Sequence, residues 1–211
     1  TLTTPRPLAR ADVSILLNGL SEGVQNFPPL PNVPQEISKV ESLFSNHATL
    51  LDKAFLLNGV NQALQKTPYS IVHLASHGQF DRDPKKTFVL TYDDKLTMNG
   101  LEKLLSFTQF RDKPVELLTL SACQTAVGDE RAALGLAGVA VKAGARSALA
   151  TLWFVNDEST SELVTEFYHQ LQNPTVSKAQ ALQNAQKQLI ETSEYRHPMY
   201  WAPFLLIGNW L

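Results

Sequence analysis

LLTLSAC at residues 117–123 is an apolar run that ends in the only cysteine of the chain. An earlier run, IVHLASHG at residues 71–78, is also largely apolar and ends in His77 and Gly78. Such nearly continuous apolar runs are typical of strands that are buried on both faces of a parallel sheet. The carboxyl ends of these strands meet at one edge of the sheet, where α/β enzymes hold their catalytic residues. We therefore predict that His77 and Cys123 come together at that edge.

The rest of the chain alternates between short apolar runs and segments with helical periodicity, which predicts an α/β fold with a mostly parallel sheet covered by helices on both faces. A proline-rich loop is expected at 26–34, where four prolines favour an extended backbone. Further strands are expected at 13–17, 48–51, 88–92, 147–152 and 201–207, and helices at 37–44, 61–64, 101–105, 132–143, 157–171 and 175–190.

Composition limits the classes of function. The 211 residues suffice for one α/β domain, and a net charge of −2 gives no indication of a nucleic-acid partner. A single cysteine excludes an internal disulfide and a cysteine-rich zinc site, and the scattered histidines indicate no metal site. No apolar run reaches the roughly 18 residues that a membrane span needs, and no signal peptide is expected. The simplest expectation is a reducing, cytoplasmic setting.

Cysteine and histidine at neighbouring strand ends indicate nucleophilic catalysis. A thiol becomes a strong nucleophile at neutral pH when a base takes its proton, so Cys123 is the candidate nucleophile and His77 the candidate base. A backbone carbonyl group could orient the ring of His77. Gly78 is either a turn residue or an oxyanion-hole donor together with the N–H group of Cys123, and the two roles are compatible.

The other histidines are expected to be structural. His73 lies inside its strand, on the same side as Ile71 and Ala75, which favours a core or interface histidine over a base. His47, His169 and His197 have no neighbouring residues that indicate a site.

The two runs together resemble clan CD cysteine peptidases, the caspase-like proteases, in which one hydrophobic strand ends in His-Gly and another in Ala-Cys. The closer resemblance is to the CHAT domain, a bacterial caspase-like branch related to separase. Four segments carry it: IVHLASHGQF, LLTLSACQTAVGD, GLAGVAVKAGARSALATLWFVNDEST and HPMYWAPFLLIG. The polar segment at 1–12, which holds two prolines, is expected to be a linker. The resemblance implies one domain at 13–211, folded as a caspase-like three-layer α/β sandwich.

The resemblance also implies an activity, which is that of a cysteine endopeptidase with a Cys123/His77 dyad and no cofactor. Peptidases of this branch cleave protein or peptide substrates, tend to cut after a basic residue, and are often latent until activated. CHAT domains commonly form the C-terminal part of longer bacterial proteins, often after TPR-type helical repeats. Such repeats are therefore the expected partner, in the same or in another protein.

The resemblance places Asp157 in the specificity pocket, where a carboxylate could form a bidentate pair with a basic P1 side chain. The competing interpretation is that Asp157 is the N-cap of the following helix. Glu158 is the second candidate for the pocket acid, and Trp153 is a pocket wall or a core residue. The loop that carries Thr125 and Asp129 could bind substrate.

Two alternatives remain open at this point. The domain could keep the dyad by descent and act as a latent or inactive protein-interaction and signalling module. A weaker alternative is an α/β thiol hydrolase that acts on small molecules, although Asp157 disfavours an ester substrate.

Overall fold

The structure is a computed structural model that describes residues 13–79, 83–109, 114–124, 138, 140–141, 143–153 and 155–211. In this part of the chain eight strands form one sheet, in the order β2-β1-β3-β6-β7-β8, and the hairpin of β4 and β5 pairs with the end of β3. The strands are β1 (Ile15–Gly19), β2 (His47–Leu51), β3 (Ile71–Gln79), β4 (Phe88–Leu90), β5 (Lys95–Thr97), β6 (Leu117–Gln124), β7 (Ser147–Thr151) and β8 (Phe204–Gly208).

The sheet is mostly parallel. Strands β2, β1, β3, β6 and β7 run in one direction, whereas β8 is antiparallel to β7 and the β4–β5 hairpin is antiparallel to β3. The parallel strands therefore place their carboxyl ends at a common edge.

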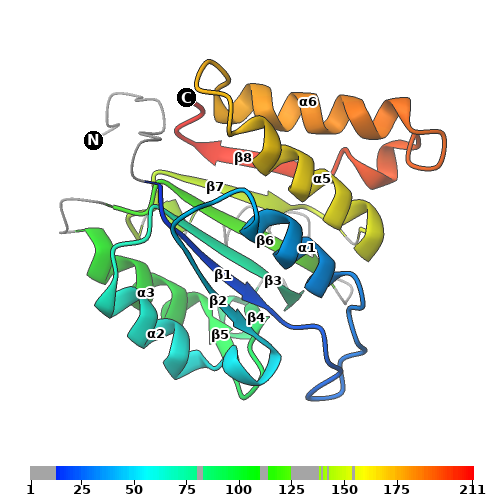
Figure 1. The fold of residues 1–211 in the computed structure, drawn as a ribbon. Coiled ribbons are helices and arrows are strands. Elements are labelled where there is room, and N and C mark those ends of the chain that lie inside the picture. Colours follow the sequence, from blue (N-terminus) through cyan, green and yellow to red (C-terminus); the bar gives the residue numbers. More distant parts are fainter. Residues whose placement is uncertain are drawn as a thin grey trace.

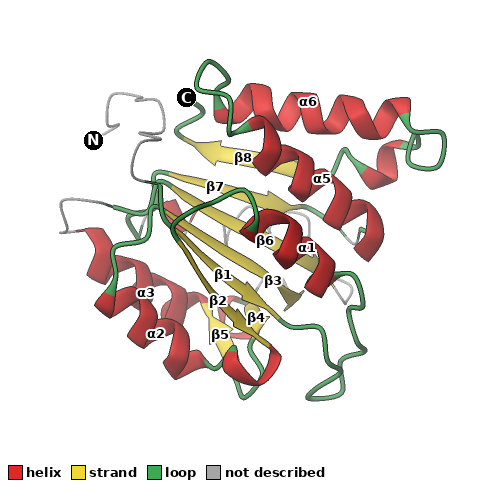
Figure 2. Cartoon of the chain, viewed as in Figure 1, coloured by secondary structure: helices red, strands yellow, loops and turns green. Residues whose placement is uncertain are grey.

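Helices cover both faces of the sheet, so the fold has three layers (Figure 1, Figure 2). One face carries α2 and α3, and the other carries α1, α5 and α6. The helices are α1 (Val33–Glu41), α2 (Leu57–Lys66), α3 (Met98–Gln109), α5 (Asp157–Gln170) and α6 (Lys178–Glu191), with short 3-10 turns η2 (Asp52–Ala54), η3 (Pro84–Lys86) and η4 (Pro198–Tyr200). This arrangement confirms the predicted α/β sandwich.

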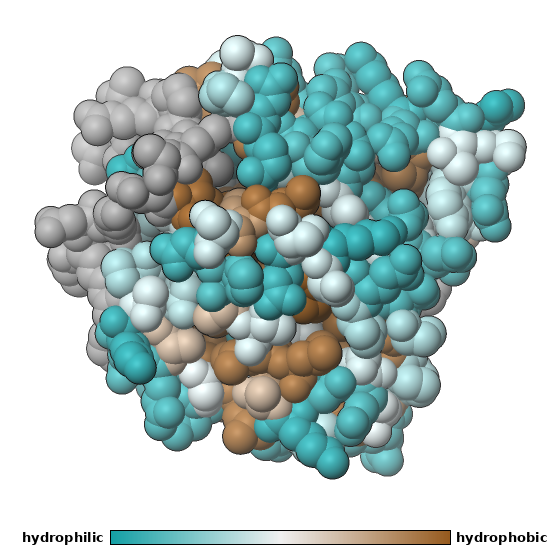
Figure 3. Space-filling view, viewed as in Figure 1, coloured by the Kyte–Doolittle hydropathy of each residue, from teal (hydrophilic) through white to brown (hydrophobic). Residues whose placement is uncertain are grey.

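Alternate residues of the central strands supply the two cores. In β3, Val72 and Leu74 pack in the core under α2 and α3, whereas Ile71 and Ala75 pack in the core under α1, α5 and α6. All of these side chains are at most 1% exposed, which explains why the strand sequence lacks polar alternation. The outer surface of α6 is mostly hydrophilic, as expected for a helix that covers a core with one side only (Figure 3).

The apolar pattern predicts strands at 71–75 and 116–121, and both strands extend beyond these carboxyl ends. Strand β3 continues through His77 to Gln79, and β6 continues through Cys123 to Gln124. The extension of β3 is stabilised by β4, because Gly78 pairs with Val89 in an antiparallel register. His77 and Cys123 therefore belong to the sheet and not to the loops that follow it, and Gly78 is a strand residue instead of a turn residue.

Helix α1 begins earlier than predicted, at Val33, because Pro34 lies in its first turn. Proline fits this position, where the backbone N–H group has no partner within the helix and the fixed φ angle is already helical. Of the helix predicted at 132–143, only Gly138, Ala140 and Val141 are both described and helical. The linker predicted at 1–12 lies outside the described residues.

Candidate functional site

The parallel register of β3 and β6 places His77 directly beside Cys123. Neighbouring strands lie about 4.8 Å apart, so the backbones of the two residues are adjacent near the carboxyl ends of their strands. Gly78 follows, in register with Gln124 of β6. The sheet thus brings together the two residues that the sequence singled out, 46 positions apart along the chain.

The ring of His77 is held from one side by the loop between β1 and α1, which we call the β1–α1 loop (residues 20–32). Its Nε2 atom lies 2.7 Å from the backbone oxygen of Pro28, and the ring of Phe27 lies 5.1 Å from that of His77, centroid to centroid. A carbonyl oxygen only accepts hydrogen bonds, so Nε2 carries the proton and donates it to Pro28. The neutral ring then has its lone pair on Nδ1.

Nδ1 of His77 is buried and forms no hydrogen bond with any described residue. The side chain is only 2% exposed. An unpaired buried nitrogen costs free energy, so its presence calls for an explanation. A base that must stay available to a thiol and to the leaving group of a substrate supplies one.

Burial lowers the pKa of His77 below its ordinary value, and this effect outweighs two opposing ones. The hydrogen bond to Pro28 and the negative charge of Asp157 both raise the pKa. The net result favours a neutral imidazole at neutral pH, which is the form that can accept a proton.

The β1–α1 loop is fixed at several points. Asp52, just after β2, accepts hydrogen bonds from the backbone N–H groups of Ser21 (2.6 Å) and Glu22 (3.0 Å). Gln25 donates through Nε2 to the backbone oxygen of Thr91 at 3.2 Å. Gln25 and Asn26 both have positive φ angles, of 53° and 70°, which non-glycine residues rarely adopt. These contacts hold the loop in a conformation that presents the carbonyl group of Pro28 to His77.

Asp157 lies in the first turn of α5, and the prediction that it is the N-cap is wrong. The N-cap is Asn156, whose side chain accepts a hydrogen bond from the backbone N–H of Ser159 at 3.0 Å. The carboxylate of Asp157 instead contacts the β1–α1 loop. Its Oδ2 atom accepts from both the backbone N–H and the Nδ2 group of Asn32, each at 2.9 Å.

The other two pocket candidates have different surroundings. Glu158 is exposed and hydrogen-bonds to Tyr195, where burial and the charge of Glu158 raise the pKa of the tyrosine. Trp153 is half-buried in the connection between β7 and α5. Of the two acids, only Asp157 acts electrostatically on His77.

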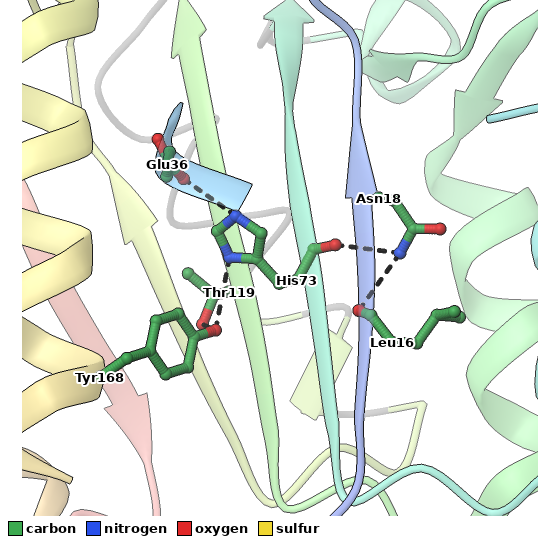
Figure 4. A network of polar contacts seen from close by, with 6 residues as sticks. All are labelled: Leu16, Asn18, Glu36, His73, Thr119 and Tyr168. Carbon is green, nitrogen blue, oxygen red and sulfur yellow. Dashed lines mark hydrogen bonds and ion pairs between the residues drawn. The ribbon is translucent and has the colours of Figure 1, made fainter. Parts of the chain in front are cut away.

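His73 is fully buried in a polar network on the α1 and α5 side of the sheet (Figure 4). Its Nε2 atom lies 2.9 Å from Oε1 of Glu36, and its Nδ1 atom lies 3.3 Å from the hydroxyl group of Tyr168. That hydroxyl group donates its own proton to Thr119 at 2.7 Å. Both ring nitrogens of His73 therefore face acceptors, and neither is left to serve as a base.

The remaining histidines also have structural contacts. His47 lies 3.2 Å from Glu41, His169 lies 3.4 Å from Glu166, and the ring of His197 accepts a hydrogen bond from the backbone of Met199. Thr125 and Asp129 lie outside the described residues.

Sequence reasoning did not identify Pro28 or Asn32. The role of Pro28 depends on its backbone oxygen, which every residue has, so no residue type could mark it. Asn32 carries a weak signal, because an asparagine just before a proline-started helix is a common N-cap. Its side chain nevertheless makes no capping hydrogen bond.

Among the described residues, no group of three or more His, Cys, Asp or Glu side chains is placed to hold a metal ion. Within the same ranges, no helix is long and apolar enough to cross a membrane.

The chain matches the CHAT domain family over residues 2–209. Among solved structures it resembles the Arg-specific cysteine proteinase gingipain R, with a TM-score of 0.63 and 12% identity over 93% of this chain and 46% of the gingipain chain. It also resembles protein GSU0716 from Geobacter sulfurreducens, with a TM-score of 0.53 and 14% identity over 93% of this chain and 94% of that protein. No curated protein matches the chain.

These likenesses show the fold, which is that of caspase-like cysteine peptidases. The chain spans less than half the length of the gingipain R chain.

Proposed function

Because this chain belongs to the CHAT domain family, we propose that it is a cysteine endopeptidase that uses Cys123 and His77 and cuts after a basic P1 residue. One observation carries the proposal, which is the asymmetric environment of His77. One ring nitrogen is held by Pro28, and the other is buried and unpaired within the described residues, on the strand next to Cys123.

In the proposed reaction, Nδ1 of His77 takes the thiol proton of Cys123, and the thiolate sulfur attacks the scissile carbonyl carbon. The C–N bond then breaks, and the imidazolium gives its proton to the leaving amine, which yields a thioester. Water attacks the thioester with His77 again as the base, and this step releases the acid and restores the thiol. The N–H groups of Gly78 and Cys123 are the proposed donors to the developing oxyanion.

The hydrogen bond to Pro28 supports this scheme because it fixes the tautomer. With Nε2 protonated, Nδ1 is the only nitrogen that can act as the base. The lowered pKa keeps that nitrogen deprotonated at neutral pH.

Asp157 supports the basic P1 preference. It is half-buried and close enough to His77 for its charge to raise the pKa of the ring, so it lies near the proposed reaction centre. A carboxylate at such a place attracts a positively charged side chain of the substrate. The name of gingipain R states arginine specificity for that protein, on the same fold.

The test is labelling with an irreversible peptide probe that carries arginine at P1, beside a matched probe with aspartate. We expect an adduct on Cys123 with the arginine probe alone, located by mass spectrometry. The adduct should disappear in His77→Ala and persist in His169→Ala, a matched histidine that is 64% exposed.

Labelling by the aspartate probe would contradict the basic P1 preference. If neither probe labels Cys123 while iodoacetamide still alkylates it, the protein as purified is no active peptidase. That result would favour the alternative of a latent or inactive interaction module.

A further inference from the structure

The two carboxylate oxygens of Asp157 accept different numbers of hydrogen bonds. Oδ2 accepts two hydrogen bonds, both from Asn32 and both 2.9 Å long. Oδ1 accepts none from the residues that the structure describes. A carboxylate has about four acceptor positions, two on each oxygen. Asn32 therefore fills one oxygen and leaves the other available.

The position of Asn32 suits this role. It is the N-cap of α1 but has φ and ψ angles of −88° and −13°, and its side chain makes no capping hydrogen bond. The amide group is thus committed to Asp157, 125 residues away, and not to its own helix. The anchors of the β1–α1 loop described above, through Asp52 and Gln25, hold Asn32 in place.

The free oxygen determines which cation the carboxylate can bind well. A guanidinium group pairs most strongly in a fork, with one N–H group on each carboxylate oxygen. On Asp157 that fork would have to displace a donor of Asn32 from Oδ2. An ammonium group is a compact charge that needs only one acceptor, and Oδ1 offers it.

We propose that Asn32 is a positioning residue that makes the Asp157 site accept lysine and arginine at P1 nearly alike. The inference rests on the proposed function, because it assumes that Asp157 meets the P1 side chain. It refines the expected bidentate pair into a contact through one oxygen.

The experiment compares two peptide substrates that differ only in arginine or lysine at P1. In the wild-type protein we expect kcat/KM values within about fivefold of each other. In Asn32→Ala one acceptor position on Oδ2 becomes free, because only the backbone N–H group still donates. The arginine-to-lysine ratio should then rise by about tenfold, the usual effect of one added hydrogen bond between charged groups.

The change should appear in the ratio of the two kcat/KM values, because the two peptides differ only in the side chain that meets Asp157. The matched control is Asn184→Ala, which removes an asparagine side chain that donates to Gln170 at 2.9 Å between α6 and α5. That variant should leave the ratio unchanged. A mere loss of stability in Asn32→Ala would lower both rates and leave their ratio as it was.

A second measurement separates this inference from the peptidase proposal. In the Cys123→Ala background, binding of the same two peptides is measured by calorimetry, with and without Asn32→Ala. A ratio of affinities that rises in Asn32→Ala would support the inference even if the wild-type protein hydrolyses nothing. Three results would overturn it: a wild-type ratio outside about fivefold in either direction, a ratio unchanged by Asn32→Ala, or no binding of either peptide. In the last case, hydrolysis of a peptide with norleucine at P1 would show that the peptidase proposal itself survives.

Discussion

His73 and His77 lie four residues apart on the same strand and face the same side of the sheet, yet their surroundings differ. Both are almost fully buried. His73 is enclosed by Glu36 and Tyr168, so that both of its nitrogens are engaged. His77 is held on one nitrogen only, by the carbonyl group of Pro28. The comparison shows that burial and residue type do not separate the two histidines, whereas their neighbours do: Nε2 of His73 lies beside a carboxylate, and Nδ1 of His77 has no partner among the described residues.

The comparison predicts opposite outcomes for function and stability at the two positions. His77→Ala should reduce peptide hydrolysis by about 10²–10⁴-fold, the usual contribution of a general acid–base residue. Its free energy of unfolding should fall by about 2 kcal/mol, since truncation of the buried ring leaves a cavity beside Phe27 and removes one hydrogen bond. Steady-state kinetics and urea unfolding of the same preparation measure both. If His77→Ala retained more than a tenth of the activity, His77 would not be the base.

The largest loss of stability should come from the buried polar network around His73 (Figure 4). Glu36→Ala leaves His73 without its ionic partner in a site that is 1% exposed or less, and such a loss costs about 3–5 kcal/mol. Urea unfolding followed by circular dichroism measures it. The matched control is Glu41→Ala, on the same helix as Glu36. It removes a half-exposed glutamate that lies beside His47, and it should cost under about 1 kcal/mol. Equal losses in the two variants would contradict the picture of a closed buried network.

A smaller effect concerns the pH dependence of hydrolysis at the site of His77. The charge of Asp157 raises the pKa of His77, whereas burial lowers it more strongly. Asp157→Asn removes the charge, so the pKa of His77 should fall further below its ordinary value. The acid limb of kcat/KM for a peptide with norleucine at P1 should therefore move to lower pH, and NMR titration of the ring should move with it.

Two results would count against this assignment. An acid limb that moves to higher pH in Asp157→Asn has the wrong sign for the loss of a nearby negative charge. An unchanged limb would mean that the charge of Asp157 does not reach His77. Glu158→Gln is the matched control, and it should leave the limb in place.

The smallest effect is expected in the buried polar network around His73. Tyr168→Phe removes the hydroxyl group that bonds to Thr119 and His73, while the ring remains packed against Phe167 and Phe44. One hydrogen-bonding group of this kind is worth about 1 kcal/mol, so the free energy of unfolding should fall by roughly that amount. Activity should stay within about twofold. A large loss of activity without loss of stability would mean that the network acts on catalysis.

The sequence was sufficient to predict the sheet and the pair of candidate residues, because buried parallel strands leave a strong apolar pattern that stops at His77 and Cys123. It was also sufficient to set His73 apart from His77 by position in the strand. The extent of β3 was underestimated, since the pairing that extends it comes from β4, which the local sequence does not reveal.

The contacts around the site could not be predicted for a different reason. The Pro28 contact uses a backbone oxygen, and the Asn32 contact joins residues 125 positions apart, so neither follows from local propensity. Of the two interpretations of Asp157, that of the N-cap of α5 was wrong by one residue, because Asn156 and Asp157 are both good caps. The hydrogen bond from the N–H group of Ser159 to the side chain of Asn156 identifies the cap, and the carboxylate of Asp157 contacts the β1–α1 loop instead.

The order of the strands has a consequence for how the protein is made. Pro28, His77, Cys123 and Asp157 follow four different strands or lie within them, and the last of these strands, β7, is synthesised after β1, β3 and β6. A nascent chain that has left the ribosome only as far as β6 already contains the histidine and the cysteine, but lacks the helix that carries Asp157. Under the proposed function, a chain at that stage of its synthesis would not yet bind a cationic P1 side chain.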